Sequence, residues 1–164
     1  RGRAAEYSGH HIYLFGVALQ FIELGLTPER AVRAVKENLE FIAIPTRWAL
    51  ADLRDTERDP SPWFLRFDPS TLNSLRYPES DADDASFGMF YAGTGTLGEL
   101  IGDMGTLWPR IAAVNLTSLL ARLRAMFEYR GEPVLKLFEE ELVAWLEKMP
   151  DDGLPTDGGK NAST

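Results

Sequence analysis

Residues 8–35 read SGHHIYLFGVALQFIELGLTPERAVRAV. The first half of this stretch predicts a helix with one buried face, because its apolar residues recur every three or four positions. The residues of that expected face are Ile12, Phe15, Leu19 and Ile22, and the stripe is widened by Leu14, Ala18 and Phe21. Ser8 is the expected N-cap of the helix. Gly25 follows the last apolar position and predicts a left-handed turn that ends the helix.

Start signals for a second helix follow this turn directly. Thr27 is an expected N-cap, and Pro28 fits the first helical position, where the backbone N–H has no partner within the helix. We expect the second helix to continue to Pro45, whose ring removes a backbone donor and clashes with the preceding turn. A third helix is expected from about residue 46 to residue 54.

The pattern changes after residue 58, where short apolar segments bounded by turn residues predict strands. These segments are residues 63–67, 86–92 and 110–115. Helical patterns reappear at residues 97–104, 116–129 and 134–149. The last of these is amphipathic, and we expect Glu139, Glu140 and Glu141 on its outer face. The sequence therefore predicts a helix-rich α+β fold with about three short strands.

Composition divides the chain into three parts. Residues 1–58 are a helical segment, and residues 59–149 are expected to form a small α/β module for regulation or dimerisation, with the amphipathic helix at its end. Residues 150–164 are rich in Gly, Asp, Ser and Thr, so we expect a disordered tail that buries too little apolar surface to become ordered.

The charge is distributed unevenly along the 164 residues. The net charge of −8 opposes non-specific nucleic-acid binding by the surface as a whole. Residues 1–50 nevertheless carry six basic and five acidic residues, a net +1, whereas residues 51–110 carry −6 and residues 111–164 carry −3. A nucleic-acid contact is therefore expected only in the first of these segments.

Several classes of protein are excluded by composition. The chain has no cysteine, which excludes disulfide scaffolds and thiolate zinc sites. Its longest apolar stretch, residues 12–24, contains Gln20 and Glu23 and is shorter than a bilayer span. The first residues lack the unbroken apolar run of a signal peptide. We expect a cytoplasmic protein without a membrane partner.

One glycine pattern leaves a nucleotide site open. Gly93, Gly95 and Gly98 spell G-x-G-x-x-G between a predicted strand and a predicted helix, the context in which backbone N–H groups bind a diphosphate. The next strand ends in Asn115 and not in the acidic residue that would bind a ribose hydroxyl. A simple turn between strand and helix is the alternative.

No other motif predicts catalysis, a metal or a cofactor. His10 and His11 are adjacent, lack ligand spacing, and are interpreted as surface or capping residues. Asp81, Asp83 and Asp84 lack the glycine and distal glutamate of a calcium loop. The serines lack the context of a nucleophile elbow. We therefore expect no catalytic residue, and the chain is not expected to be an enzyme.

Two apolar groups are candidate binding surfaces. Aromatic residues of the predicted strands form either core or, if one face is open, a pocket for an apolar or planar effector. The residues expected in that pocket are Trp63, Phe67, Phe90, Tyr91, Gly93 and Gly95. On the last helix, the shared face of Leu142, Trp145 and Leu146 is expected to pair subunits of a homodimer.

A family resemblance covers about residues 1–35. Arg3, the pair Tyr7-Ser8, Leu14, the pair Leu24-Gly25 and the run Thr27-Pro28-Glu29 resemble the second half of the DNA-binding domain of the mercury-resistance regulator (MerR) family. The resemblance implies a winged-helix domain whose recognition helix precedes Arg1. It also implies that Arg1 and Arg3 contact phosphates or the minor groove from the wing, and that Tyr7 makes a packing or backbone contact.

The resemblance implies a transcriptional regulator that binds DNA as the full-length protein. The family usually continues into one long dimerising helix, whereas Pro45 is expected to interrupt this one. Residues 59–149 are then an effector-sensing or dimerisation module. A small nucleotide-binding enzyme or sensor using Gly93, Gly95 and Gly98 is one alternative, and a protein-interaction module without DNA binding is another.

Overall fold

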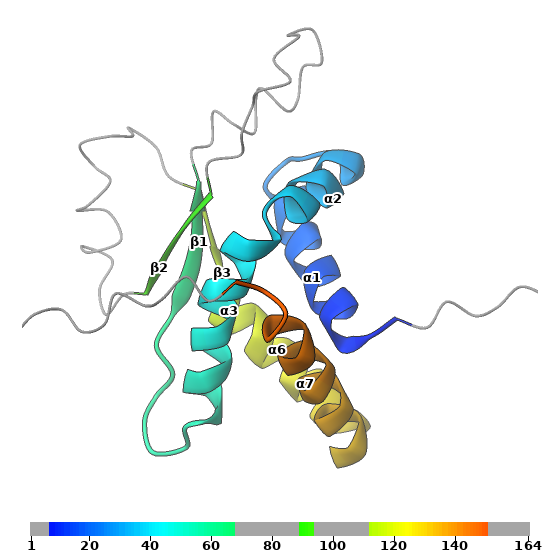
Figure 1. The fold of residues 1–164 in the computed structure, drawn as a ribbon, viewed down its shortest axis with the longest axis vertical. Helices are drawn as coiled ribbons and strands as arrows, with labels where there is room; N and C mark the ends of the chain where they lie inside the picture. The colour runs from blue at the N-terminus through cyan, green and yellow to red at the C-terminus, as the bar shows by residue number, and fades with distance from the viewer. Residues whose placement is uncertain (1–6, 68–88, 94–111, 151–164) are drawn as a thin grey trace, which may run out of the picture.

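The computed structural model describes residues 7–67, 89–93 and 112–150 (Figure 1). These residues form five helices and three strands, which confirms a helix-rich α+β fold. In chain order the elements are α1 (Gly9–Glu23), α2 (Pro28–Glu37), α3 (Leu39–Arg54), β1 (Trp63–Phe67), β2 (Met89–Gly93), β3 (Ala112–Asn115), α6 (Leu116–Arg130) and α7 (Glu132–Leu146). The predicted helix over residues 97–104 and the predicted tail over residues 150–164, apart from residue 150, lie outside the described residues.

The three strands form one antiparallel sheet in the order β2-β1-β3. Leu65 in the central strand pairs with Tyr91 on one side and with Val114 on the other. Leu65 and Val114 are both buried, so this directly opposed pair faces the helices. In Figure 1 the sheet lies on one side of the molecule and α1 and α2 lie on the other. A winged-helix arrangement is not confirmed in these residues.

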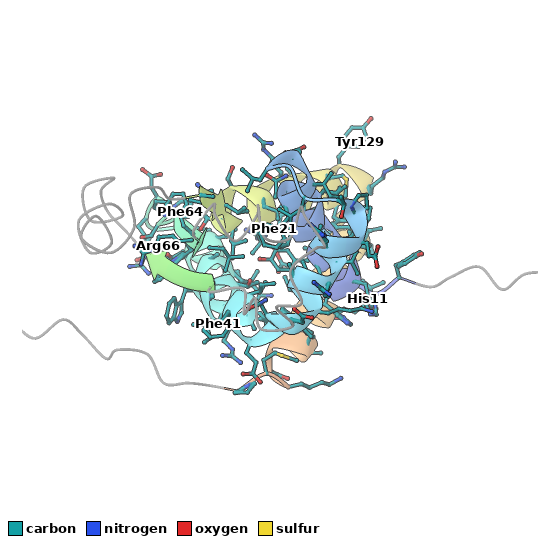
Figure 2. All side chains as sticks on the ribbon, turned by 90° about the horizontal axis from the view of Figure 1, so that it is seen from above. His11, Phe21, Phe41, Phe64, Arg66 and Tyr129 are labelled. Carbon is teal, nitrogen blue, oxygen red and sulfur yellow. The ribbon has the colours of Figure 1, made fainter. Side chains whose placement is uncertain are left out.

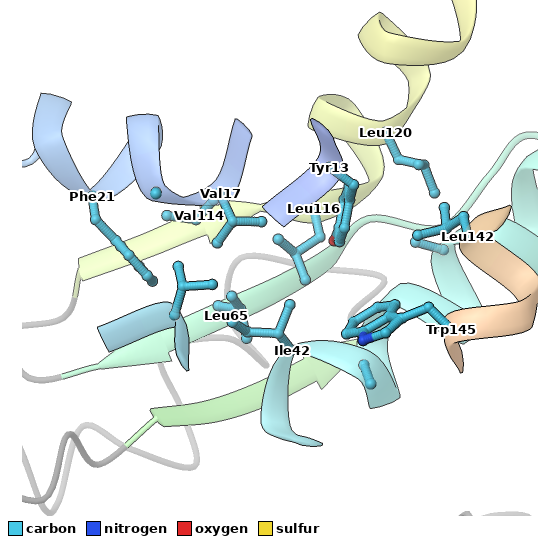
Figure 3. Packing of buried hydrophobic residues seen from close by; sticks show 14 of the residues in the cluster. Tyr13, Val17, Phe21, Ile42, Leu65, Val114, Leu116, Leu120, Leu142 and Trp145 are labelled. Carbon is cyan, nitrogen blue, oxygen red and sulfur yellow. The ribbon is translucent and has the colours of Figure 1, made fainter. Parts of the chain in front are cut away.

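One hydrophobic core joins all the layers (Figure 3). It unites residues from both sides of the boundary expected at residue 58, since α1 packs against α6 and α7. The labelled core residues are Tyr13, Val17, Phe21, Ile42, Leu65, Val114, Leu116, Leu120, Leu142 and Trp145. Two of the amino-terminal helices, α1 and α3, therefore pack against the carboxyl-terminal ones, while α2 packs mainly on α1.

The expected buried face of α1 is only partly correct, because Ala18 and Phe21 are buried but two of its four central residues are exposed. Phe15 is 61% exposed and Leu19 is 41% exposed, while the fully buried stripe is Tyr13, Val17 and Phe21. Both stripes have helical spacing, so periodicity alone does not choose between them. Gly9 favours the observed face, because a β-carbon there would meet the backbone of Phe138 in α7, whereas one at Gly16 would meet only flexible leucine side chains of α6, the nearest being Leu119.

The expected position of the helix break is wrong. The break falls at Asn38 and α3 continues through Pro45, which is fully buried. At the break, the Asn38 side chain donates to the Ala34 carbonyl at 2.8 Å and so helps to end α2. Proline in a helix interior costs about 3 kcal/mol. We attribute the survival of α3 to the burial of Pro45 and its neighbours, including Ile42 and Leu50.

Helix ends largely follow their local signals. Gly25 and Gly131 have φ values of 107° and 115°, the left-handed conformation that ends α1 and α6. Ser8 and Thr27 stand at the N-cap positions, although neither side chain caps its helix. The Gly9 N–H at the start of α1 instead donates to the carboxylate of Glu141 in α7.

The expected acidic outer face of α7 is only partly exposed. Glu140 is a surface residue near Lys136, at 3.8 Å, but Glu139 accepts from Arg124 at 2.7 Å and from Arg54 at 3.0 Å. Glu139 thereby joins α7 to α6 and α3.

Among the described helices, none combines the length and apolar character needed to cross a bilayer.

Candidate functional site

An apolar groove of about 750 Å³ lies between α1 and α2. Its lining comes from the start and exposed side of α1, from α2 and the first residue of α3, and from the end of α7. We call it the α1–α2 groove; its lining residues are Tyr7, His10, His11, Ile12, Leu14, Phe15, Ala18, Val32, Val35, Lys36, Leu39 and Trp145. Almost all of the lining surface is apolar.

The groove exists because α1 is apolar on two sides. The stripe of Tyr13 and Val17 fills the core, so the second stripe, with Phe15, is left to face outward beside α2. Ala18 and Val35 are both buried and form the inner part of the lining, while Phe15 and Val32 remain exposed. The turn at Gly25 and buried Leu26 hold α2 against α1.

Two histidines lie at the end of the groove nearest the chain start. The Ser8 Oγ is 2.8 Å from the His10 Nδ1 and 2.7 Å from the His11 Nδ1. A hydroxyl has one proton, so Ser8 donates to one ring and the other ring donates to Ser8. Their ring centroids are 4.1 Å apart. Ser8 therefore links the two imidazoles and does not cap α1.

His10 is held in its neutral form by its surroundings. Burial lowers the pKa of His10, and the neighbouring His11 and Lys148 lower it further. Glu141 raises this pKa, but its effect is smaller than that of burial or that of His11. The ring lies parallel to that of Trp145, with centroids 6.1 Å apart and planes at 4°. His10 thus presents a flat, uncharged ring to the groove at neutral pH.

Trp145 is fixed in position by contacts beyond the groove. Arg47 of α3 donates to the carbonyl of the last residue of α7, Leu146, at 2.5 Å, and to those of Met149 and Pro150 beyond it, at 2.8 Å and 3.3 Å. A cation at the carboxyl end of a helix also favours the helix dipole. Arg47 therefore anchors the end of α7 that supplies one wall of the groove.

Most of the side chains of the predicted effector pocket on the strands lie outside the described part, so that pocket stays a prediction. Trp63 packs against Trp48, with ring centroids 4.4 Å apart, and donates its indole N–H to Asp52 at 2.9 Å. Both partners belong to α3, so Trp63 is held against that helix. Phe67, Phe90 and Tyr91 occupy β1 and β2, and their side chains lie outside the described part. Gly93 ends β2, whereas Gly95 and Gly98 lie outside the described residues.

The other predicted site residues divide into three groups. Arg1 and Arg3 lie outside the described residues, while Tyr7 is 72% exposed and lines the groove. Leu142 and Leu146 are buried in the chain's own core, as is most of Trp145, so they present little surface to a partner subunit. Figure 2 shows His11 at the opposite side of the molecule from Phe64 and Arg66 of β1.

Sequence reasoning missed the groove and gave His10 and His11 no binding role. The available signal was the unusual breadth of apolar residues around α1, where Leu14 and Ala18 widen the stripe until two faces compete. Within the described part of the chain, no group of three or more acidic or histidine side chains is placed to hold a metal ion.

Comparison with protein-family models, with curated proteins and with solved structures finds no match to this chain.

Proposed function

We propose that this chain is a non-catalytic binding module that accepts a small apolar molecule in the α1–α2 groove. The observation that carries the proposal is an almost wholly apolar groove of about 750 Å³ at which Phe15 and Val32 stay exposed. Binding sites for small molecules commonly have volumes of about 300–1,000 Å³ and few polar groups. A ligand that covers Phe15 and Val32 gains hydrophobic free energy in proportion to the apolar area it removes from water.

The direct test uses N-phenyl-1-naphthylamine, an uncharged aromatic fluorophore whose emission rises in apolar surroundings. We expect saturable binding that raises the melting temperature, because a ligand that binds only the folded state stabilises it. Val32→Glu places a charge in the wall that ligand binding would desolvate, and is expected to weaken binding about tenfold or more.

The matched control is Leu137→Glu, which changes another exposed apolar residue, on α7 outside the groove lining. This variant should bind the fluorophore as the wild type does. Absence of saturable binding, or equal binding by Val32→Glu and the wild type, would refute a ligand site in the groove.

A second candidate places this module in a DNA-binding transcriptional regulator. It is favoured by the order of α1, the left-handed Gly25 and α2 starting at Pro28, which agrees with the resemblance to the mercury-resistance regulator family. In that setting Arg1 and Arg3 contact phosphates, and the groove senses an effector. Dimerisation and DNA binding belong to this proposal alone.

The test of the second candidate is the salt dependence of binding to duplex DNA. Each arginine that neutralises a phosphate contributes about one unit to the slope of log K against log salt. Arg1→Ala and Arg3→Ala should each reduce the slope by about that amount. A full-length protein that fails to bind any duplex at low salt would eliminate this candidate.

A further inference from the structure

We infer that the ligand of the α1–α2 groove is an amphipathic carboxylate, whose apolar part lies along Phe15 and Val32 and whose anionic head lies at Lys36. This inference rests on the proposed function and adds the chemical class of the ligand.

The first argument is the sign of the polar groups that line the groove. They are the hydroxyl of Tyr7, the two imidazoles of His10 and His11, and the ammonium of Lys36. The hydroxyl of Tyr7 and the ammonium of Lys36 can donate hydrogen bonds, and the lysine carries a full positive charge. Of the two imidazoles, the ring whose Nδ1 accepts from Ser8 keeps an Nε2–H that can also donate. Among the described lining residues there is no Asp or Glu, although the chain as a whole carries a net charge of −8.

The second argument is that Lys36 has no ion pair with a described residue. Its neighbour Arg33 pairs with Glu37 one turn further along α2, at 3.8 Å. Glu40, four residues after Lys36, would be the usual helical partner. The break at Asn38 interrupts the helix between Lys36 and Glu40, so this i, i+4 geometry is lost. The ammonium of Lys36 is thus available to an anion from outside the chain.

The third argument is the arrangement of apolar and polar parts. Apolar side chains make up most of the lining, and Ala18 and Val35 among them are buried. Lys36 is an exposed residue of the last turn of α2. A lysine stem can lie along an apolar surface while its head stays in water. A molecule with one apolar body and one carboxylate therefore matches both the apolar lining of the groove and the exposed ammonium of Lys36.

The test compares three ligands with the same ten-carbon chain: decanoate, decanol and decylamine. Each competes with N-phenyl-1-naphthylamine at neutral pH, decanoate and decylamine below their critical micelle concentrations and decanol below its solubility limit. An added ion pair at a partly exposed site favours decanoate over decanol by about fivefold. The preference should shrink at high salt, because salt screens exposed charges. Decylamine should bind weakest of the three.

The matched variants are Lys36→Met and Lys136→Met. Lys36→Met keeps an unbranched apolar stem and removes the charge, so decanoate and decanol should then compete equally. Lys136 is an exposed lysine of α7 outside the groove lining, and its replacement should leave the preference for decanoate intact. Binding of decanol by Lys36→Met shows that the groove itself survives the change.

The outcomes separate the inference from the proposed function. If the fluorophore and decanol bind but decanoate has no advantage, or if Lys36→Met retains that advantage, the ligand class is wrong while the apolar site stands. If neither the fluorophore nor any of the three ligands binds, both the site and the ligand class are wrong.

Discussion

At the scale of single residues, Tyr13 and Thr46 form a buried hydrogen-bonded pair inside the helical core. The Thr46 Oγ1 donates to the Ile42 carbonyl at 2.5 Å, which uses its one proton. The Tyr13 hydroxyl, 2.7 Å away, must therefore donate to Thr46. Burial raises the pKa of Tyr13, and the hydrogen bond to Thr46 opposes that rise, so the phenol stays protonated. The pair joins α1 to α3 across the core.

Removing either partner of this pair should have unequal effects. Tyr13→Phe deletes a donor that no other group needs, and should cost about 1 kcal/mol of unfolding free energy. Thr46→Val leaves the Tyr13 hydroxyl buried without an acceptor, and should cost about 2 kcal/mol or more. The double variant should be no less stable than Thr46→Val alone. Urea unfolding measures all three; a larger loss for Tyr13→Phe than for Thr46→Val would contradict this account.

His10 makes the stability of the fold depend on pH. Burial and His11 hold the pKa of the folded-state imidazole below its usual 6.5, so below that pH the unfolded chain binds a proton that the folded chain does not. Stability is therefore complete above about pH 6.5 and falls as the pH drops towards 5.

The variant His10→Phe isolates this effect, because it keeps a flat ring beside Trp145 and cannot be protonated. Glu141 and Lys148, the other charged groups near His10, are unchanged in the variant. When the pH falls from about 7 to about 5, the melting temperature of the wild type should drop further than that of His10→Phe. Equal losses in the two proteins would show that His10 does not control the acid response.

At the scale of elements, the sequence predicted those helix boundaries that depend only on neighbouring residues. Gly25 and Thr27 mark helix boundaries because the conformation of two or three residues decides them. Pro45 misled the prediction, since its local cost is offset by burial that depends on distant residues. The buried face of α1 was predicted only in part for the same reason: it is selected by α6 and α7, more than ninety residues away in the sequence. The groove is lined by the apolar face of α1 that stays outside the core, so the sequence could not predict the groove either.

Two glycines of α1 give a direct test of how its face is chosen. A β-carbon at Gly9 would lie 2.6 Å from the Phe138 carbonyl oxygen, a backbone atom that cannot move alone. Gly9→Ala should therefore destabilise the protein by about 1–3 kcal/mol. At Gly16 the nearest atom is the Leu119 Cδ1 at 3.3 Å, on a flexible side chain.

Gly16→Ala is the matched control, because alanine is favoured over glycine in a helix by about 1 kcal/mol. That gain should equal or exceed the cost of shifting Leu119, so the variant should be as stable as the wild type or more stable. Thermal unfolding of the two variants measures the difference. If Gly9→Ala were the more stable of the pair, close contact between α1 and α7 would not be what fixes the orientation of α1.

At the scale of the whole molecule, hydrogen bonds join the amino-terminal helices α1 and α3 to the carboxyl-terminal helix α7. The carboxylate of Glu141 accepts from the first N–H of α1, and Arg47 donates to the carbonyls that end α7. Arg54 and Arg124 meet on Glu139, which ties α3 and α6 to α7. The groove depends on this closure, because its walls come from α1 and α2 on one side and from Trp145 on the other.

This closure predicts that the first 58 residues do not fold alone. In that fragment Tyr13 and Val17 of α1 would lose the α6 and α7 residues that cover them, including Leu120 and Leu142. Exposing that much apolar surface removes the main term that offsets chain entropy. We expect fragment 1–58 to show no cooperative thermal transition and no saturable binding of N-phenyl-1-naphthylamine, whereas mixing it with fragment 59–164 should restore both. A cooperative transition of fragment 1–58 by itself would mean that the amino-terminal helices form an independent domain, and that the groove needs α7 only for one wall.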